Sequence, residues 1–449
     1  MNEQRGLELP WSVQQQVFDQ QIDRQRRRER RFVVGTGLLL FLVLLFTVWG
    51  DVTLAPPRTH QLEFVAHVTP HVQQPTPTVQ AAPGPQSALI ASQVDNFVTG
   101  QVNRHRFSGS VLIAQDGQVL LSKGYSMANW DSQVSNTPHT QFYLGSTTKQ
   151  FTAMAILILQ ERGKLHVRDH LCSHIAHCPS AWQPVTIHEL LTHTSGIPQL
   201  DDSSLSDASP EAWIASYDGV SLAFTPGSQY SYCSVCYQIL GYVIEQASGQ
   251  PYSAFLQQAI FNPLQMKNTG FDPHDLSASE SAVGYAGWQI KAVSLDWTVD
   301  PRWSFLFGSG LLHTTVEDLF RWDQTLYTHT LVSQKTLDEA FTPYYVSQYA
   351  GSSYGYGWFI AKAPVQGHRL IWHDGRIDGF RSYIGRYIDD HITIIFLSNL
   401  ATLDELAFAH SLEQIVFDRT SFIHAPATSR RPASNLQVED TGSHTESQG

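Results

Sequence analysis

The sequence has few charged residues, and positive charge is especially scarce. Asp, Glu, Lys and Arg together make up 15% of the 449 residues, and 28 basic side chains against 40 acidic ones leave a net charge of −12. The chain is not a disordered polyampholyte, because 42% of its residues are hydrophobic and can build a large core. The shortage of positive charge argues against a nucleic-acid partner, which requires a basic surface.

Charge is absent altogether from residues 32–50, which read FVVGTGLLLFLVLLFTVWG. As an α-helix, this run would roughly span the ~30 Å hydrocarbon core of a bilayer. The basic segment 1–31 before it ends in a cluster of arginines, namely Arg26, Arg27, Arg28, Arg30 and Arg31. The positive-inside rule therefore predicts a single-pass protein of the cell membrane, with everything after Asp51 extracellular. A cleaved signal peptide is the alternative, but the run is too long for one and no A-x-A-like site follows it.

Cysteine is also rare, and the four cysteines fall in two pairs on the predicted outer side of the membrane, where disulfides persist. Cys172 and Cys178 flank a short loop and are the best candidates for a disulfide. Cys233 and Cys236 are three residues apart, in a segment that we interpret as the start of a helix. A bridge there would be strained, so we expect two free, small apolar side chains.

The rest of the chain divides by composition. Residues 51–86 are rich in Pro, Thr, Gln and Val, which predicts an extended, semi-rigid linker. Residues 421–449 are polar and predict a disordered tail. These segments leave residues 87–420 as one large globular domain.

Within that domain, strand-like patterns lie at both ends and helical patterns lie between them. A helical pattern at 88–102 is followed by two apolar runs joined by Asp116-Gly117, which is a strong hairpin signal. Residues 370–399 contain three more strand-like runs. We expect an α+β fold, with an antiparallel sheet built from both chain ends, helices flanking it, and a helical subdomain.

The clearest chemical signal is the Ser146-Thr147-Thr148-Lys149 stretch at the start of an apolar helix. Residues i and i+3 share a helix face, so the hydroxyl and the amine can meet. An ordinary lysine, with a pKa of roughly 10.4, is a poor base. Burial at a helix N-terminus, beside other cations, would disfavour the ammonium form and let the amine take the serine proton. The alternative is a helix-capping serine followed by a solvated lysine, and this motif alone does not separate the two.

Two later segments favour the catalytic interpretation. Tyr232 follows a Pro-Gly turn and precedes an amphipathic helix that ends at Gly249. His373 and Gly375 lie at a strand edge, shortly before Gly379. A glycine at such an edge lets a substrate lie along the strand backbone.

In this order and spacing, the three segments resemble the serine β-lactamase and penicillin-binding protein superfamily. The closer likeness is to its class C β-lactamase-like branch, which includes D-amino-acid peptidases and esterases. Supporting phrases are LLTHTSGIP at 190–198, NPLQMKNTGF at 262–271 and GSGLLHTTVEDL at 308–319. The resemblance implies an acyl-enzyme mechanism on an ester, a D-Ala-type peptide or a β-lactam, with a small-molecule or peptide acyl substrate and no metal or organic cofactor.

The resemblance also implies a role for each matching residue. Ser146 would be the nucleophile, Lys149 its proton acceptor, and Tyr232 would transfer a proton to the leaving group. The family has an asparagine where this chain has Ser234, whose single hydroxyl replaces a carboxamide. That departure leaves the substrate open, and it motivates an alternative: a catalytically degenerate, membrane-tethered binding protein for cell-wall fragments or β-lactams.

For substrate binding, the resemblance implies His373 and Gly375, which match a position that esterase-like members write as His-x-Gly. The backbone N–H groups of Ser146 and Arg376 would form the oxyanion hole, each worth roughly a hundredfold or more in rate. The side chains of His373, Arg376 and Arg381 could bind a substrate carboxylate, or they could pair with acidic neighbours. Oligomeric state is not predicted by the sequence.

Other clusters admit a simpler interpretation. Residues 166–178 hold four histidines, Cys172, Cys178 and Asp169, whose types suit Zn²⁺, but a disulfide loop with surface histidines explains them and we expect no metal. His193 could be a triad histidine, yet its place where a helix gives way to a loop favours a structural role. Aromatic residues at 288–303 and 344–358 could line a cleft or simply pack in the core.

Overall fold

A computed structural model describes residues 84–200, 210–271, 280–291, 308–347, 349–363 and 365–420. The expected membrane helix at 32–50, nearly all of the linker and the polar tail lie outside these ranges. Among the helices of the described ranges, none combines the length and the apolar character needed to cross a membrane.

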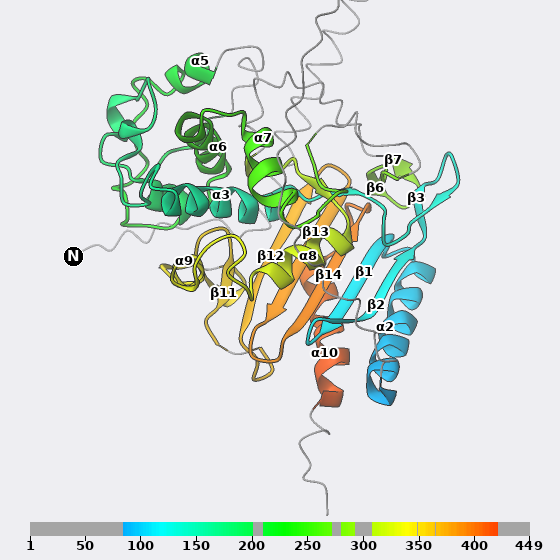
Figure 1. The fold of residues 1–449 in the computed structure, drawn as a ribbon. Helices are drawn as coiled ribbons and strands as arrows, with labels where there is room; N and C mark the ends of the chain where they lie inside the picture. Colours follow the sequence, from blue (N-terminus) through cyan, green and yellow to red (C-terminus); the bar gives the residue numbers. More distant parts are fainter. Residues whose placement is uncertain are drawn as a thin grey trace, which may run out of the picture. The chain divides into compact units, whose positions relative to one another are not determined.

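The centre of the fold is an antiparallel eight-stranded sheet with the strand order β2-β1-β14-β13-β12-β11-β10-β9 (Figure 1). It consists of β1 (Gly109–Gln115), β2 (Gln118–Tyr125), β9 (Tyr345–Val346), β10 (Ser352–Tyr354), β11 (Phe359–Ala361), β12 (Leu370–Ile377), β13 (Phe380–Tyr387) and β14 (Ile392–Ser398). In the pairing of β1 with β14, Gly109 lies opposite Ser398 and Gln115 opposite Ile392. The prediction of an antiparallel sheet that joins early and late strands is thus confirmed.

The turns of this sheet lie where the sequence predicts them. Asp116 and Gly117 have φ values of 50° and 73°, the left-handed conformation that a two-residue hairpin turn requires. Gly379 (φ 79°) lies in the β12–β13 turn, and His391 (φ 51°) follows Asp389-Asp390 in the β13–β14 turn.

Helices cover both faces of the sheet because its strands send alternate side chains to opposite sides. On β1, Val111 and Ile113 join a core with α2 (Pro85–Asn103) and α10 (Glu405–Thr420). Leu112 and Ala114 join the larger core on the other side. Both sides of β1 are therefore buried, which explains its continuous apolar run.

The remaining helices contribute to the larger core, and Figure 1 shows α3, α6 and α7 grouped beside the sheet. They are α3 (Lys149–Glu161), α4 (Ile187–Leu191), α5 (Pro210–Ala215), α6 (Ser234–Ser248), α7 (Tyr252–Leu256), α8 (Val316–Thr325) and α9 (Gln334–Ala340). As predicted, α6 ends at Gly249, whose left-handed conformation (φ 72°) caps the helix. A π-helical turn, η5 (Gln257–Phe261), continues α7.

Short elements connect these layers. The minor ladders pair β3 (Met127–Asn129) with β4 (Val134–Ser135), β5 (Phe142–Tyr143) with β8 (His313–Thr314), and β6 (Tyr285–Gly287) with β7 (Ile290–Lys291). The 3₁₀ turns are η1 (Gly145–Thr148), η2 (Leu171–Ser173), η3 (Ser180–Trp182) and η8 (Tyr349–Gly351).

Both cysteine pairs form disulfides. The Cys172–Cys178 bridge confirms the sequence prediction. The Cys233–Cys236 bridge shows that the expectation of free thiols there was wrong. Cys233 is the N-cap of α6, with φ −131° and ψ 97°, and its Cα lies 5.3 Å from that of Cys236. Because Cys233 is extended rather than helical, the two side chains can meet without distorting the helix.

Candidate active site

Ser146 lies in the 3₁₀ turn η1, and α3 itself begins at Lys149. The α-helix therefore starts three residues later than expected, but the tighter turn brings positions i and i+3 together even more closely. Nζ of Lys149 donates hydrogen bonds to Oγ of Ser146 (3.0 Å) and to the carbonyl oxygen of Ser309 (2.8 Å). Of the two alternatives left open by the sequence, the structure contains the Ser–Lys contact and not the solvated lysine.

Burial gives this lysine unusual electrostatics. The Lys149 side chain has no exposed surface, and desolvation lowers its pKa to about 7, while the charge of Asp374 acts in the opposite direction. The ammonium group lies 5.0 Å from the ring centroid of Tyr232 and 5.6 Å from that of Tyr237. Burial is the cause that the sequence suggested. A carboxylate, rather than other cations, is the charge that acts on this pKa. A substantial fraction of Lys149 is neutral near pH 7 and can accept a proton.

Tyr232 lies against the same pair. The residue as a whole is 40% exposed, but desolvation raises the phenol pKa, while a hydrogen bond with Ser146 opposes that shift. The phenol is thus protonated at neutral pH and lies next to the Ser146 hydroxyl. That arrangement can pass a proton between the serine and a leaving group.

The turn that carries Ser146 docks directly on strands β12 and β13, and Ser382 lies on β13. Oγ of Ser382 donates to the carbonyl oxygen of Leu144 (2.6 Å) and forms a 2.8 Å hydrogen bond with Oγ1 of Thr147. A Cβ at Gly375 would lie 1.9 Å from that carbonyl oxygen. The missing side chain of Gly375 makes room for the nucleophile turn. That a substrate lies along this strand backbone stays a prediction. A Cβ at Gly145 would similarly meet the Arg376 backbone at 2.7 Å, so the two backbone segments proposed for the oxyanion hole are in contact.

His373 is buried and fully engaged. Its Nδ1 donates to the carbonyl oxygen of Asp374 (2.6 Å), and its Nε2 accepts from the hydroxyl of Tyr354 (3.0 Å). Burial lowers its pKa to about 3, with the Lys149 charge acting in the same direction. The imidazole is therefore neutral and accepts a hydrogen bond from Tyr354, and its role in substrate binding stays a prediction.

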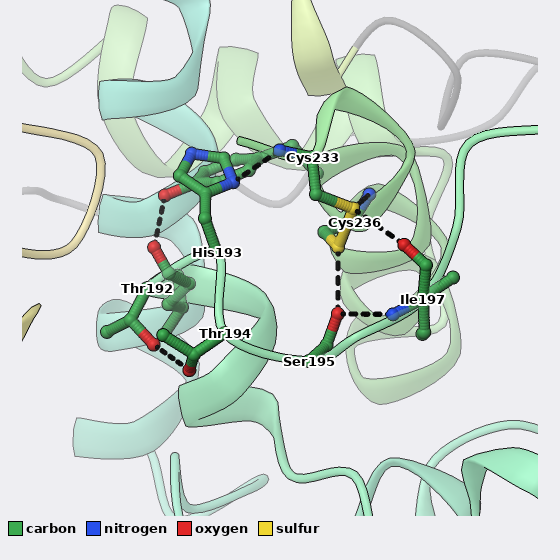
Figure 2. Close-up of a disulfide and its surroundings, with 9 residues drawn as sticks. Thr192, His193, Thr194, Ser195, Ile197, Cys233 and Cys236 are labelled. Carbon is green, nitrogen blue, oxygen red and sulfur yellow. Dashed lines mark hydrogen bonds between the residues drawn. A yellow bond between two sulfur atoms is a disulfide. The ribbon is translucent and has the colours of Figure 1, made fainter. Parts of the chain in front are cut away.

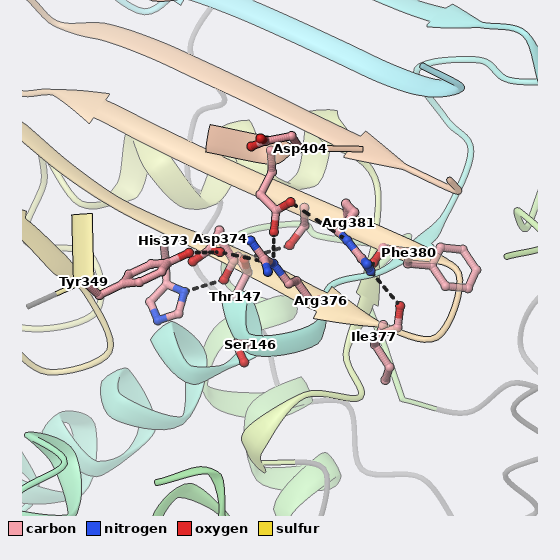
Figure 3. A network of polar contacts seen from close by, with 12 residues as sticks. Ser146, Thr147, Tyr349, His373, Asp374, Arg376, Ile377, Phe380, Arg381 and Asp404 are labelled. Atoms are coloured by element: carbon pink, nitrogen blue, oxygen red, sulfur yellow. Dashed lines mark hydrogen bonds and ion pairs between the residues drawn. The ribbon is translucent and has the colours of Figure 1, made fainter. Parts of the chain in front are cut away.

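The charged side chains beside β12 form a network, shown in Figure 3. Arg376 pairs with Glu405 and lies 3.9 Å from the Asp374 carboxylate, which accepts a 2.9 Å hydrogen bond from Tyr349. Arg381 lies 3.9 Å from Glu405. The structure thus answers a question that the sequence left open, because both guanidinium groups pair with acidic residues. Glu405 was missed from the sequence, since it lies on α10, outside every motif.

Ser234 is the first residue of α6 and is half-buried. Among the described residues, none forms a hydrogen bond with its hydroxyl. The position that corresponds to the family's asparagine therefore has one small polar group without a fixed partner in the protein.

The histidine-rich loop is held by pairwise contacts. His174 binds Asp169 and His177 binds Asp218, each at 2.9 Å, beside the Cys172–Cys178 bridge. Over the ranges that the structure describes, no three His, Cys, Asp or Glu side chains gather as a metal site would require.

The two aromatic stretches differ in their surroundings. Trp288 stacks on His105 and packs against Trp130, whereas most of the remaining stretch to 303 lies outside the described ranges. Tyr354, Tyr356 and Trp358 are buried, so the second stretch contributes mainly to the core.

Comparisons with known proteins identify the family and the fold. A family model described as "Beta-lactamase" matches residues 90–414. A penicillin-binding protein of Bacillus subtilis (strain 168) is 30% identical over 356 residues, which cover 75% of this chain and 78% of that protein. The octameric penicillin-binding protein homologue from Pyrococcus abyssi has a similar structure, with a TM-score of 0.65 and 26% identity over 73% of this chain and 77% of that one. A penicillin-binding protein from Bacillus halodurans shares the fold, with a TM-score of 0.60 and 24% identity over 70% and 98% of the two chains.

Proposed function

The chain belongs to the β-lactamase and penicillin-binding protein superfamily, and on that basis we propose that it is a serine hydrolase with Ser146 as its nucleophile. One observation carries the proposal: a buried lysine with a pKa of about 7 donates a hydrogen bond to the hydroxyl of that serine. The pair unites a nucleophile with a base whose pKa suits neutral pH.

In the proposed reaction, Oγ of Ser146 attacks the substrate carbonyl while the neutral Lys149 amine takes its proton. The N–H groups of Ser146 and Arg376 stabilise the oxyanion. The C–O or C–N bond breaks as Tyr232 gives its proton to the leaving group, and Tyr232 recovers a proton from the Lys149 ammonium. Water then hydrolyses the acyl-enzyme, with the same groups moving the protons.

We propose an ester as the preferred substrate class. The groups considered for binding a carboxylate are occupied, since Arg376 and Arg381 pair with Glu405, and burial keeps His373 neutral. Ser234 also replaces the carboxamide that in the family recognises a substrate amide. Both features weigh against D-Ala-type peptides and β-lactams, which carry a carboxylate and an amide.

The alternative proposal keeps the fold and the acylation step but loses turnover. Its supporting observation is Ser234, whose hydroxyl is unpartnered among the described residues and is too short to replace the asparagine directly. A protein of this kind would be acylated once by a β-lactam and would then hold the adduct. Stoichiometric labelling without product release favours this function.

We also propose that the hydrolase is anchored to the cell membrane with its catalytic domain outside. The uncharged run at 32–50 and the arginines before it support this orientation. The two disulfides fit an oxidising compartment. Protease treatment of intact cells should digest the domain, and its full protection would contradict the proposal.

The full-length protein in detergent tests the function. It should hydrolyse p-nitrophenyl esters faster than nitrocefin or a D-Ala-D-Ala peptide, and a fluorophosphonate probe should label it. Ser146→Ala should lower hydrolysis at least about a thousandfold and abolish labelling. Ser411→Ala, on the exposed face of α10, is the control and should behave like the wild type. Equal labelling of the Ser146 variant would contradict the proposal.

A further inference from the structure

The chain on both sides of Tyr232 is held by a single residue, His193. The N–H of Ser231 donates to the backbone carbonyl oxygen of His193 (2.9 Å), and the N–H of Cys233 donates to Nδ1 of its ring (3.0 Å). Figure 2 shows the imidazole directed at the Cys233 backbone. His193 therefore accepts a hydrogen bond from the residue just before Tyr232 and another from the residue just after it.

The conformation of His193 is itself unusual. It has a φ of 60°, which places a residue with a side chain in the left-handed region, and it is completely buried. Such conformations persist where the surrounding structure holds them, and they concentrate at functional sites. The flanking residues supply that support, since Thr192 and Thr194 form a hydrogen bond with each other at 2.8 Å.

The ring of His193 also packs against the ring of Tyr232. The two ring centroids lie 4.3 Å apart, and the rings of Tyr354 (4.6 Å) and Tyr237 (5.1 Å) also pack against the imidazole. Because Nδ1 accepts from an amide, the proton of the neutral ring must lie on Nε2. Burial, with the charge of Lys149, lowers the pKa of His193 well below its ordinary value, so the ring stays an acceptor.

We propose that His193 is a positioning residue that holds Tyr232 so that its hydroxyl is directed at Ser146. The inference rests on the proposed hydrolase function and goes beyond it. His193 is not the base of a triad, because its Nδ1 is occupied by the Cys233 amide and Lys149 is the group bonded to Ser146. The Cys233–Cys236 bridge holds the chain immediately after the same tyrosine.

The nature of the leaving group gives a specific readout. When the ester C–O bond breaks, an alkoxide must receive the Tyr232 proton, whereas p-nitrophenolate leaves without one. A displaced Tyr232 should therefore lower kcat/KM, which reports acylation, far more for an alkyl ester than for a p-nitrophenyl ester. General loss of structure would slow both to the same degree.

The test compares His193→Asn with His193→Gln. The Asn side chain places an oxygen near the position of Nδ1 and tolerates the left-handed conformation, whereas the longer Gln side chain places its oxygen near Nε2. The quantity to compare is kcat/KM, because it reports acylation and not the deacylation step that both esters share. With ethyl butyrate, kcat/KM should fall about a hundredfold in the Gln variant and stay within about threefold of wild type in the Asn variant. With p-nitrophenyl butyrate, both should stay within about threefold. An equal loss on both esters in the Gln variant overturns the proposal.

Two further measurements separate this inference from the proposed function. His193→Gln combined with Tyr232→Phe should be no slower on ethyl butyrate than Tyr232→Phe alone, and fully additive losses overturn the inference. Amide hydrogen exchange across residues 230–234 needs no activity. Exchange should be faster in the Gln variant than in the wild type and the Asn variant. Equal protection in all three overturns the positioning role of His193, and this result does not depend on whether Ser146→Ala supports the hydrolase function.

Discussion

Lys149 forms a 3.0 Å hydrogen bond with Ser146 from a position where the lysine has no contact with solvent. The burial that makes the amine a usable base also lowers the stability of the folded protein, because a charged amine is unfavourable there. Replacing this lysine should therefore remove activity and raise stability.

Activity should follow the ionisation of Lys149. Because its pKa is lowered to about 7, kcat/KM for a neutral ester should rise about tenfold for each pH unit below 7 and level off above it. The measurement is a kcat/KM profile between pH 5 and 9 with p-nitrophenyl butyrate. A flat profile down to pH 5 would remove Lys149 from the role of base.

Stability should increase when Lys149 becomes Met. Its pKa is about 7 in the folded protein and 10.5 ordinarily, so between these values the unfolded chain binds more protons and stability rises with pH. The burial cost is complete below pH 7 and vanishes above pH 10.5. At pH 6.5 we expect Lys149→Met to raise the free energy of unfolding by about 1–2 kcal/mol, with a smaller gain at pH 9.5, in urea titrations. Lys123→Met, at an exposed lysine paired with Asp95, should give no gain.

Asp374 should tune the same ionisation. Its charge opposes the fall in the Lys149 pKa, so Asp374→Asn should move the acidic limb of the kcat/KM profile to lower pH. Asp389→Asn, at an exposed carboxylate paired with Arg369, is the control and should leave the limb unchanged. A shift to higher pH in the Asp374 variant would contradict the electrostatic assignment.

The two disulfides should have separable effects. Replacing either cysteine pair with serine removes a constraint on a short loop and should cost about 2 kcal/mol of unfolding free energy. Only Cys233→Ser/Cys236→Ser should also lower kcat/KM for ethyl butyrate more than for p-nitrophenyl butyrate, because that bridge adjoins Tyr232. Cys172→Ser/Cys178→Ser is the matched control, and the same selective loss there would argue against a local effect on the tyrosine.

Gly375 should tolerate no side chain. In Gly375→Ala the new Cβ would lie 1.9 Å from the carbonyl oxygen of Leu144, which is too close. The nucleophile turn would therefore have to move away from β12. We expect a loss of about 1–3 kcal/mol in stability and a clear fall in labelling by the fluorophosphonate probe. Gly287→Ala, where the nearest atom would lie at an ordinary 3.5 Å, should change neither.

The features predicted correctly are those with local signals. Asp116-Gly117 specifies its hairpin through two residues that tolerate positive φ, and the spacing of Ser146 and Lys149 brings them together in either type of helical turn. The apolar runs at 370–399 also form the predicted strands.

The features that escaped prediction depend on partners distant in sequence or on backbone conformation. Lys149 bonds the carbonyl of Ser309, and Arg376 pairs with Glu405 on a helix that no motif marks. The Cys233–Cys236 bridge depends on the extended conformation of Cys233, which the sequence does not reveal. The space at Gly375 is filled by the Leu144 backbone, a contact that only the packing of η1 on β12 creates.

The pairing of β1 with β14 has a consequence for biosynthesis. Residues 109–115 leave the ribosome long before their partners at 392–398, and at about 5–20 residues per second the delay is roughly 15–60 s. Through that interval β1 has an unpaired edge, which invites aggregation or chaperone binding. The turn bearing Ser146 likewise waits for β12 to dock against. A nascent chain would therefore carry the whole nucleophile motif and still be inert, acquiring its reactivity only when the last strands are made.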